Sequence, residues 1–417
     1  MIDRRALART LARERALADW VLVEHEAELA SVDETGVRRE QRMRWTIVVH
    51  VDVAQGRGSA RIELGMLDGS ADDMIDQAVS LAAAAIGPAW ASVPPAAPAK
   101  MKLADPALAT GDLGDTAAAV LRGLHTPAGA IFTPALEMTR EHVTVQSKSG
   151  FRTEWFATAL RATALVAAAD HSLEIVREAR RVQDLELDVA IAGAATDLAL
   201  VAKAGKPPPG KCAVILGPDA MLHGDGLGVW AAFAAQADAV VERQGLTRYR
   251  EGNPIAAGAD QITEPLTITS NGALDWGVRS APVGDEGDAV RKFAIVDRGS
   301  CSGLGLSPRE ASLRRRDPNG DVRNLEITAG TWQGEPPPGR AVEIRRLRSL
   351  SIDRYTGDAS LEIALGIDGG TPFAGGTIRL DLIAALARAR RHSGTPIRRG
   401  PYLGPSSVLI DSAELVA

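Results

Sequence analysis

Residues 221–228 read Met-Leu-His-Gly-Asp-Gly-Leu-Gly and carry the most informative chemistry of this chain. A zinc-binding helix of the type His-Glu-x-x-x-His needs two imidazoles on one face, and a glutamate beside them to take a proton from the metal-bound water. Counted from His223, the glutamate position is Gly224 and the second histidine position is Gly228. The segment keeps one such side chain and lacks the others, so we predict neither a metal ligand set nor a catalytic residue in it.

One alternative keeps His223 as a metal ligand together with Asp225 and a distant group such as His392. Glycine occupies three of the five positions after His223, which makes a poor helix and would hold the ligands loosely. The other His-Glu pair, His25 and Glu26, has no second histidine after it and lies in a segment that we expect to be helical.

Asp285 and Glu286 are adjacent carboxylates in a glycine-bounded loop. Neighbouring residues of an extended chain point to opposite sides, so the pair does not by itself form an acid/base dyad. We expect this loop to fix the geometry of a sheet or to contact a partner.

Composition and net charge limit the classes of protein to which this chain can belong. A chain of 417 residues with 45% apolar and 24% charged residues predicts a globular protein of two or three domains. The net charge of −6 argues against a general nucleic-acid binder. Arginines cluster in residues 314–316, 345–348 and 388–399, where a solvated surface is the expected explanation and an anionic peptide or acidic partner the alternative.

The location follows from what the sequence lacks. No run of about 18 apolar residues is present, which predicts no membrane-spanning helix. Acidic residues interrupt the first 20 positions, which do not read as a signal peptide. Cys212 and Cys301 have no metal-binding or redox spacing and are expected to be buried thiols. We therefore expect a cytoplasmic protein.

The N-terminal hundred residues are expected to form helix, strand, strand and helix. Leu7 and Leu11 suggest an opening amphipathic helix. Residues 44–53 alternate in polarity as a half-buried strand would, with His50 on the exposed face, and residues 59–64 add an antiparallel partner. Ser70 is expected to cap a helix that extends to Ile86, and a proline-rich linker covers residues 88–98.

The remaining chain is richer in strands. Strands are expected near residues 142–146, 155–166, 212–216, 266–269, 290–296, 325–329, 341–344 and 361–365, with one late helix over residues 380–391. We expect an α+β fold with an N-terminal α/β domain (1–98), a middle mixed α/β region (99–207) and a strand-rich C-terminal domain (208–417) with large, mostly antiparallel sheets. The sequence leaves open whether the middle region is an independent domain.

Several segments, taken in order, resemble the TldD/PmbA family, also described as modulators of DNA gyrase. The tail 404–411 is similar to the family's closing Ser-Pro-Ser-Leu-Leu-Ile strand, and residues 280–287 resemble its Pro-Phe-Asp-Asp-Glu-Gly loop, with Val283 where phenylalanine is usual. The other similar segments are residues 56–62 with the helix that follows, 143–150, 212–220, 355–357 and 375–377.

The resemblance implies a division of labour between two subunits. In this family the TldD subunit carries His-Glu-x-x-x-His and a downstream cysteine as zinc ligands, and the TldE subunit lacks them. This chain has neither the motif nor a cysteine in its last hundred residues, so it resembles the TldE branch. Zinc is then expected in a TldD-like partner and no cofactor in this chain.

The expected function is that of a TldE-like, non-catalytic subunit of a heterodimeric zinc metallopeptidase. It would close the cavity over the partner's zinc and bind unfolded or ribosomally made peptides, with His223, Asp225, Asp285 and Glu286 as candidate peptide- or partner-binding residues. Its exposed strand edges could bind extended peptide. The alternatives are a peptide- or protein-binding homodimer without peptidase activity, or a hydrolase with a relocated metal site. No nucleic-acid or membrane partner is expected, and activity of the chain alone stays open.

Overall fold

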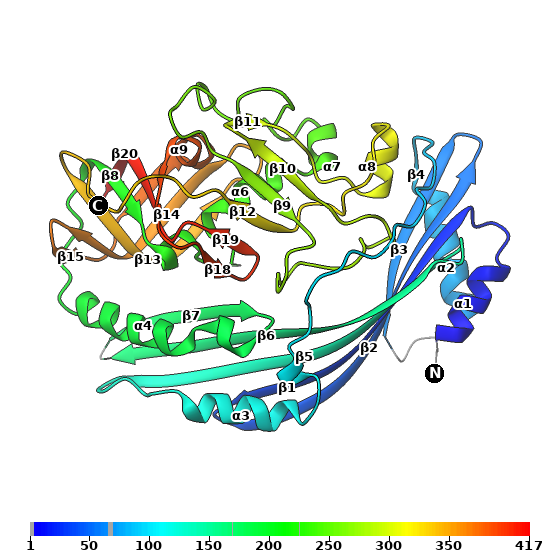
Figure 1. Cartoon of the computed structure of the whole chain (residues 1–417), viewed down its shortest axis with the longest axis horizontal. Coiled ribbons are helices and arrows are strands. Elements are labelled where there is room, and N and C mark those ends of the chain that lie inside the picture. Colours follow the sequence, from blue (N-terminus) through cyan, green and yellow to red (C-terminus); the bar gives the residue numbers. More distant parts are fainter. Residues whose placement is uncertain (1–3, 66–69, 169, 225) are drawn as a thin grey trace.

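The computed structural model describes residues 4–65, 70–168, 170–224 and 226–417. One large curved sheet carries helices on its outer side, and a strand-rich C-terminal body lies against its inner side (Figure 1). The fold is α+β with large, mostly antiparallel sheets, which confirms the expected class.

The large sheet has seven strands, and every neighbouring pair in it is antiparallel. Its central strand β1 pairs with β2 on one side and with β5 on the other, so residues 1–98 and 99–207 contribute to one sheet. In spatial order the strands are β4 (Ile86–Gly87), β3 (Gly56–Gly65), β2 (Gly36–Val53), β1 (Asp19–Asp33), β5 (Ile131–Ser147), β6 (Arg152–Ala168) and β7 (His171–Ala179).

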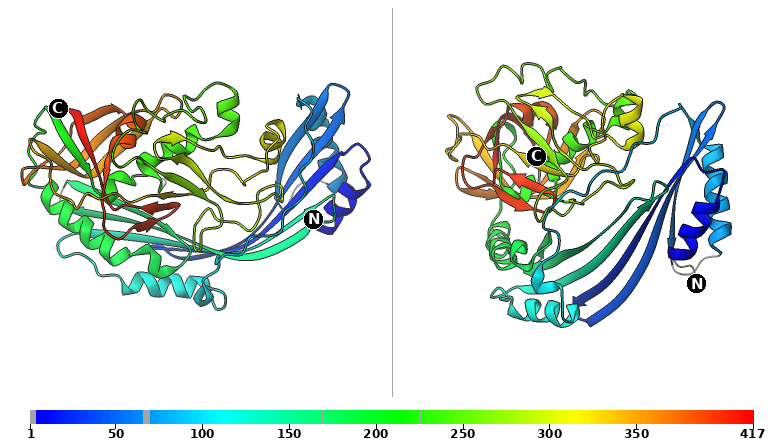
Figure 2. Two further views of the ribbon diagram at one scale, coloured as in Figure 1. Left: turned by 45° about the horizontal axis from the view of Figure 1, so that its top comes forward. Right: turned by 45° about the vertical axis from the view of Figure 1, so that its right-hand side comes forward.

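Successive side chains along β1 point to opposite faces of this sheet. Trp20 and Leu22 pack with the first two helices, whereas Val21 and Val23 pack on the opposite face against Val283 of the C-terminal half. Figure 2 shows the helices on the convex side from two further directions. They are α1 (Arg4–Arg13), α2 (Ala71–Ala84), α3 (Leu113–Gly123) and α4 (Leu187–Val201), with short 3-10 turns η1 (Pro106–Leu108) and η2 (Val182–Leu185).

Two expectations for this region are wrong. The segment around His25 and Glu26 is the strand β1 rather than a helix, because hydrogen bonding to β2 and β5 on both sides outweighs the helix propensity of its glutamates and alanines. His50 is 3% exposed rather than solvent-exposed, because the C-terminal half covers the face of β2 that its sequence pattern marks as polar.

The helix predictions hold in outline. Leu7 and Leu11 are buried in α1, and the side chain of Ser70 accepts a hydrogen bond from the backbone N–H of Asp73 at the start of α2. The late helix is shorter than expected: α9 spans Leu382–Arg388, since Leu380 pairs in a strand and the carboxylate of Asp381 caps the helix.

Residues 88–102 have no helix or strand, join β4 to η1 in the chain, and contact the C-terminal half on the way. The backbone N–H of Ala96 donates to the carbonyl of Gly287 (3.0 Å), and that of Ala99 donates to the carbonyl of Pro282 (2.8 Å). The expected linker therefore lies along the loop that carries Asp285 and Glu286.

The C-terminal half contains two sheets. The first is β11 (Ser300–Cys301), β10 (Lys292–Asp297), β9 (Ile268–Asn271), β12 (Asn324–Ile327), β19 (Tyr402–Gly404) and β18 (Ile397–Arg399). The second is β13 (Ala341–Ile352), β8 (Gly210–Leu216), β20 (Val408–Val416), β16 (Thr377–Asp381), β14 (Asp358–Asp368) and β15 (Thr371–Phe373), with β17 (Arg390–Arg391) beside β20. Because β13 also pairs with β14, strands β13, β8, β20, β16 and β14 close into a ring.

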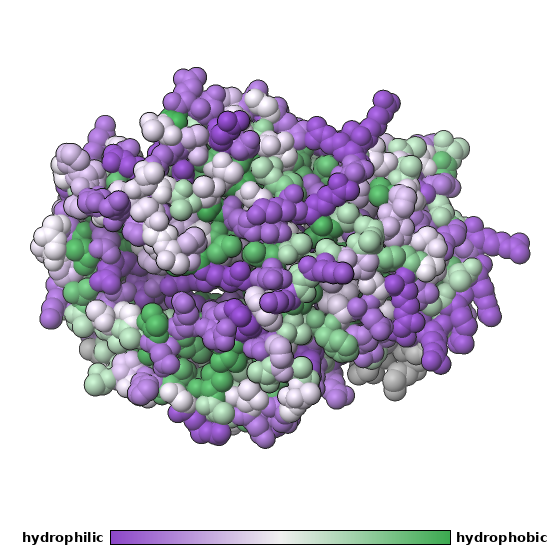
Figure 3. Space-filling model, viewed as in Figure 1, coloured by the Kyte–Doolittle hydropathy of each residue, from purple (hydrophilic) through white to green (hydrophobic). Residues whose placement is uncertain are grey.

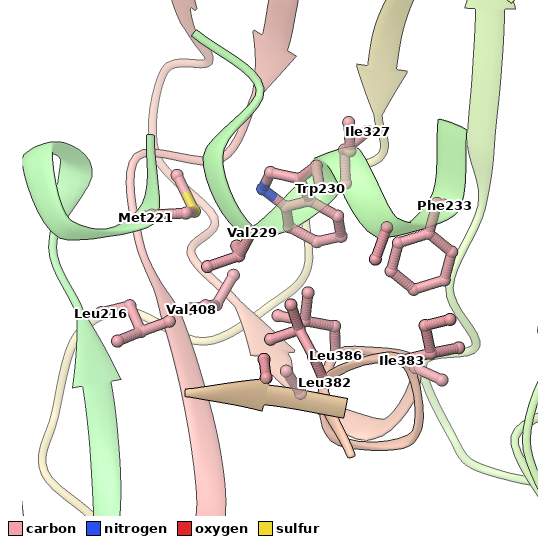
Figure 4. Packing of buried hydrophobic residues seen from close by; sticks show 14 of the residues in the cluster. Leu216, Met221, Val229, Trp230, Phe233, Ile327, Leu382, Ile383, Leu386 and Val408 are labelled. Carbon is pink, nitrogen blue, oxygen red and sulfur yellow. The ribbon is translucent and has the colours of Figure 1, made fainter. Parts of the chain in front are cut away.

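Short helices complete this half and fill its core. They are α5 (Pro218–Met221), η3 (Gly228–Trp230), α6 (Ala231–Gln236), α7 (Ala239–Arg243), α8 (Pro308–Leu313) and α9. Figure 4 shows Trp230 and Phe233 among the side chains of Ile383, Leu386 and Val408 in this core. Both cysteines are free and buried, as expected. Among the described residues, no helix is long and apolar enough to span a membrane.

Candidate functional site

A cavity of about 800 Å³ lies between the large sheet and the C-terminal half. Its walls come from β5, β6 and β7 on one side, and from β13, β14 and the segment after α5 on the other. His223 lies in the wall. The surface in Figure 3 is hollowed between the upper and lower parts of the molecule on the face shown. This is the candidate site that contains the segment singled out by the sequence.

The segment around His223 is not a helix. The helix α5 ends at Met221, Gly224 and Gly228 have φ angles of +88° and +50°, and a 3-10 turn starts at Gly228. A Cβ atom on Gly228 would lie 2.0 Å from the backbone oxygen of Met221. A histidine therefore cannot occupy position 228 in this backbone. Asp225 lies outside the described residues.

His223 is half-buried in the cavity wall. Burial lowers the pKa of its imidazole, and the nearby carboxylate of Glu174 opposes this effect. The ring is therefore expected to be neutral at pH 7. His392 is not part of this cavity wall, because its ring packs edge-on against Trp332 at 5.9 Å and faces Ser406. The structure does not bring His223 and His392 together.

Asp219 lines the same cavity as His223 and is surrounded by arginines. Its Oδ1 accepts hydrogen bonds from Nη2 of Arg177 (2.8 Å) and from Nη1 of Arg399, and its Oδ2 is 2.9 Å from Nη2 of Arg346. Burial alone would raise the pKa of Asp219, but these three guanidinium groups outweigh it and lower the pKa. Asp219 is therefore a charged carboxylate that joins α5, β7, β13 and β18.

The network extends to helix α4. Nε of Arg346 donates to Oδ2 of Asp197 (2.7 Å), and Nε of Arg345 lies 3.1 Å from Oδ1 of the same carboxylate. Arg346 is 6% exposed and Asp197 3% exposed. The arginine cluster at 345–348 thus contributes to a buried network, whereas a solvated surface was the expected explanation.

Asp285 and Glu286 occupy a second place, where the C-terminal half touches the large sheet. Oδ2 of Asp285 accepts from Nη1 of Arg61 (3.1 Å) and its Oδ1 from Nη2 of Arg323 (3.3 Å). Oε2 of Glu286 is 3.2 Å from Nε2 of His50. The two carboxylates contact different partners, as neighbouring residues of an extended loop do, and neither lines the cavity.

The region where the C-terminal half touches the large sheet also contains a buried carboxyl group. Asp288 is 3% exposed, its Oδ1 accepts from the backbone N–H of Glu286 (3.3 Å), and its Oδ2 has no hydrogen-bond partner among the described residues. Burial raises the pKa of Asp288 to about 7 and that of Asp321 to about 6. Asp285 keeps a lowered pKa because Arg323 and Arg61 outweigh its burial.

Sequence reasoning missed the role of Asp219 and its arginines. Asp219 was noticed only as part of the turn that opens the C-terminal domain, and its partners come from positions 42 to 180 residues away. No spacing in the sequence could have joined them. Among the described residues, no group of three or more histidine, cysteine, aspartate or glutamate side chains could hold a metal ion.

The C-terminal half is similar to a domain found in metallopeptidases. A family model described as "PmbA/TldA metallopeptidase C-terminal domain" matches residues 209–415. Over these residues the chain therefore resembles the TldD/PmbA family. No match is found among curated protein sequences.

Three solved structures share the fold over nearly the whole chain. TldE from Thermococcus kodakarensis superposes with a TM-score of 0.76 at 14% identity, covering 99% of this chain and 100% of that one. A putative modulator of DNA gyrase from Bacteroides thetaiotaomicron gives 0.77 at 16% identity, covering 99% and 98%. A putative modulator of a DNA gyrase from Thermotoga maritima gives 0.74 at 15% identity, covering 95% of each chain.

Proposed function

We propose that this chain is the TldE-like, non-catalytic subunit of a heterodimeric, cytoplasmic zinc metallopeptidase, and that it helps to enclose peptide over the zinc of a TldD-like partner. The observation that carries the proposal is the backbone after α5. Position 228 must be glycine because a Cβ atom would collide with the carbonyl of Met221, so the second histidine of a His-Glu-x-x-x-His helix has no room there.

The cavity beside this segment supports the peptide-binding part of the proposal. Its volume of about 800 Å³ is in the range of ligand-binding sites. The strand β7 is an edge of the large sheet, and residues 171–174 of it line the cavity. An edge strand offers backbone N–H and C=O groups to which an extended peptide can add, whatever its side chains. This suits unfolded or ribosomally made peptides.

The test is co-expression with a TldD-like protein from the same genome that carries His-Glu-x-x-x-His. We expect a stable heterodimer with about one zinc per complex, little zinc in this chain alone, and peptide cleavage only by the complex. Replacing the motif's glutamate in the partner with glutamine should abolish cleavage, whereas His223→Gln in this chain should leave a measurable kcat.

Other outcomes point to the other functions. Stoichiometric metal in the isolated chain, removed by His223→Gln, would support a hydrolase with a relocated metal site. A stable homodimer that binds peptide but forms no complex with the TldD-like protein would support a stand-alone binding protein. Either result would refute the heterodimer proposal.

A further inference from the structure

The network around Asp219 contains more positive than negative charge. Four guanidinium groups share three carboxylates. Arg177, Arg399 and Arg346 contact Asp219, Arg346 and Arg345 contact Asp197, and Nε of Arg345 also lies 3.7 Å from Oε1 of Glu343. One positive charge is thus left over. Burying such an excess is unfavourable unless an anion compensates it. The network therefore favours an anion in the adjacent space.

The cavity provides that space, and Arg177 and Arg346 both line it. Each guanidinium group has five N–H donors in a planar fork, and the carboxylates of Asp219, Asp197 and Glu343 cannot accept from all the donors of the four arginines. Burial, followed by the charge of Arg399, lowers the pKa of Arg177, and an anion beside this arginine would oppose both effects.

The strand β13 turns an additional arginine toward the same cavity. In a regular strand, successive side chains point to opposite faces, yet Arg346, Leu347 and Arg348 all line the cavity. The pairing of β13 with β14 shifts register between Ile344 and Arg346 and twice more before Ser349. Such irregularities re-aim side chains and are common beside binding sites.

Arg348 differs from the buried arginines in having no partner. Its side chain is exposed and makes no hydrogen bond or ion pair with any residue in the described part of the chain. An arginine in a cavity wall, unpaired and next to a network that already has excess positive charge, is well suited to bind a planar anion in a bidentate manner.

We propose that the part of this cavity lined by β13 binds a carboxylate group of an extended peptide, with the exposed Arg348 as the direct ligand and the buried Arg346 and Arg177 as a positive floor for the site. The inference rests on the proposed function only in taking a peptide as the source of the carboxylate. The group is either the C-terminal carboxylate or an acidic side chain, since both have the same planar geometry.

Two acidic residues in the cavity wall give the bound peptide a direction. Asp170, in the turn before β7, and Glu174, within β7, are exposed, whereas Arg346 and Arg177 are buried. Solvent and salt screen exposed charges more than buried ones, so Asp170 and Glu174 do not cancel the positive potential of Arg346 and Arg177. The carboxylate end points toward the arginines, and the amino end or a basic side chain toward Asp170 and Glu174.

Binding of three short peptides to the purified full chain, measured by isothermal titration calorimetry at low and at physiological salt, tests this. The peptides are N-acetyl-tetraalanine, its C-terminal amide, and an N-acetylated amide of the same length with one glutamate. We expect the free carboxylate to bind roughly 10- to 100-fold more tightly than the amide, the gain given by a charge-assisted hydrogen bond. The glutamate peptide shows whether a side-chain carboxylate is also accepted.

Arg348→Gln should remove most of this preference, and Arg348→Lys should restore part of it through charge alone. Because Arg348 has no partner among the described residues, the substitution breaks no ion pair, and unchanged thermal unfolding will verify the fold. Arg122→Gln, which removes an exposed arginine of α3 on the outer side, should change nothing.

Equal affinity for the acid and its amide, no binding of any of the three peptides, or an Arg348→Gln variant that binds like the wild type would each overturn the inference. These outcomes are independent of the proposed function, which is tested by complex formation and zinc content. Carboxylate binding by a chain that forms no complex with a TldD-like protein would support the site while refuting the heterodimer.

Discussion

The buried carboxyl group of Asp288 should make the stability of the fold depend on pH. Its pKa is about 7 in the folded chain, against an ordinary value of 3.8. A raised pKa in the folded state means that the contribution of this group to stability is fully present below pH 3.8 and is lost as the pH rises through 7. Linkage over this window gives a loss of about 2 kcal/mol in the free energy of unfolding between pH 5.5 and pH 8.5.

The substitution Asp288→Asn removes the titration and keeps the shape of the side chain. The wild-type chain should lose stability over this pH range, and the variant should lose about 2 kcal/mol less. The same sign applies to Asp321, whose pKa of about 6 is also raised by burial, so some pH dependence remains in the variant.

Urea unfolding followed by tryptophan fluorescence at pH 5.5, 7 and 8.5 measures this difference. Asp260→Asn is the matched control, because Asp260 is exposed and should leave the pH profile unchanged. If Asp288→Asn and the wild type show parallel profiles, the carboxyl group is charged throughout and the reasoning from burial is wrong. Equal destabilisation of the variant at every pH would lead to the same conclusion.

Three further substitutions test the local geometry, each by the same unfolding measurement. Gly228→Ala should destabilise the chain by about 3 kcal/mol or more, since its Cβ would overlap the carbonyl of Met221. Gly224→Ala is the matched control and should cost only about 1 kcal/mol, because the space around its Cβ is open. Equal effects of the two substitutions would contradict the collision at position 228. Asp219→Asn should cost about 3–5 kcal/mol because it leaves buried arginines without their carboxylate, and a neutral result would show that these charges are solvated. Ser70→Ala should cost about 1 kcal/mol through the lost cap of α2, whereas no change would mean that the helix end is held by packing alone.

Patterns within single segments correctly predicted the elements whose stability depends on residues close in sequence. The amphipathic spacing of Leu7 and Leu11, the cap at Ser70, and the alternation in β2 depend on residues close in sequence, and the structure contains all three. The helix that was expected around His25 is instead a strand, because pairing partners more than a hundred residues away decide its state. A pattern within the segment does not contain that information.

The candidate site was even harder to predict from patterns within single segments. His223 and the glycines after it marked part of one wall of the cavity, but the rest of that wall comes from β13 and β14 and the opposite wall from β5, β6 and β7. His50 looked exposed because its strand alternates in polarity, but the loop with Glu286 and the ring of Trp90 cover it. Buried polar contacts between distant segments leave no periodic signal in the sequence.

The position of β1 in the large sheet has a consequence for how the chain folds during synthesis. β1 pairs with β2 at once, but its other neighbour, β5, begins only at Ile131, about a hundred residues after β1 ends. Until those residues leave the ribosome, β1 is an open strand edge to which another chain can pair. A fragment that stops before Ile131 should therefore aggregate, and the nascent chain needs protection over that interval.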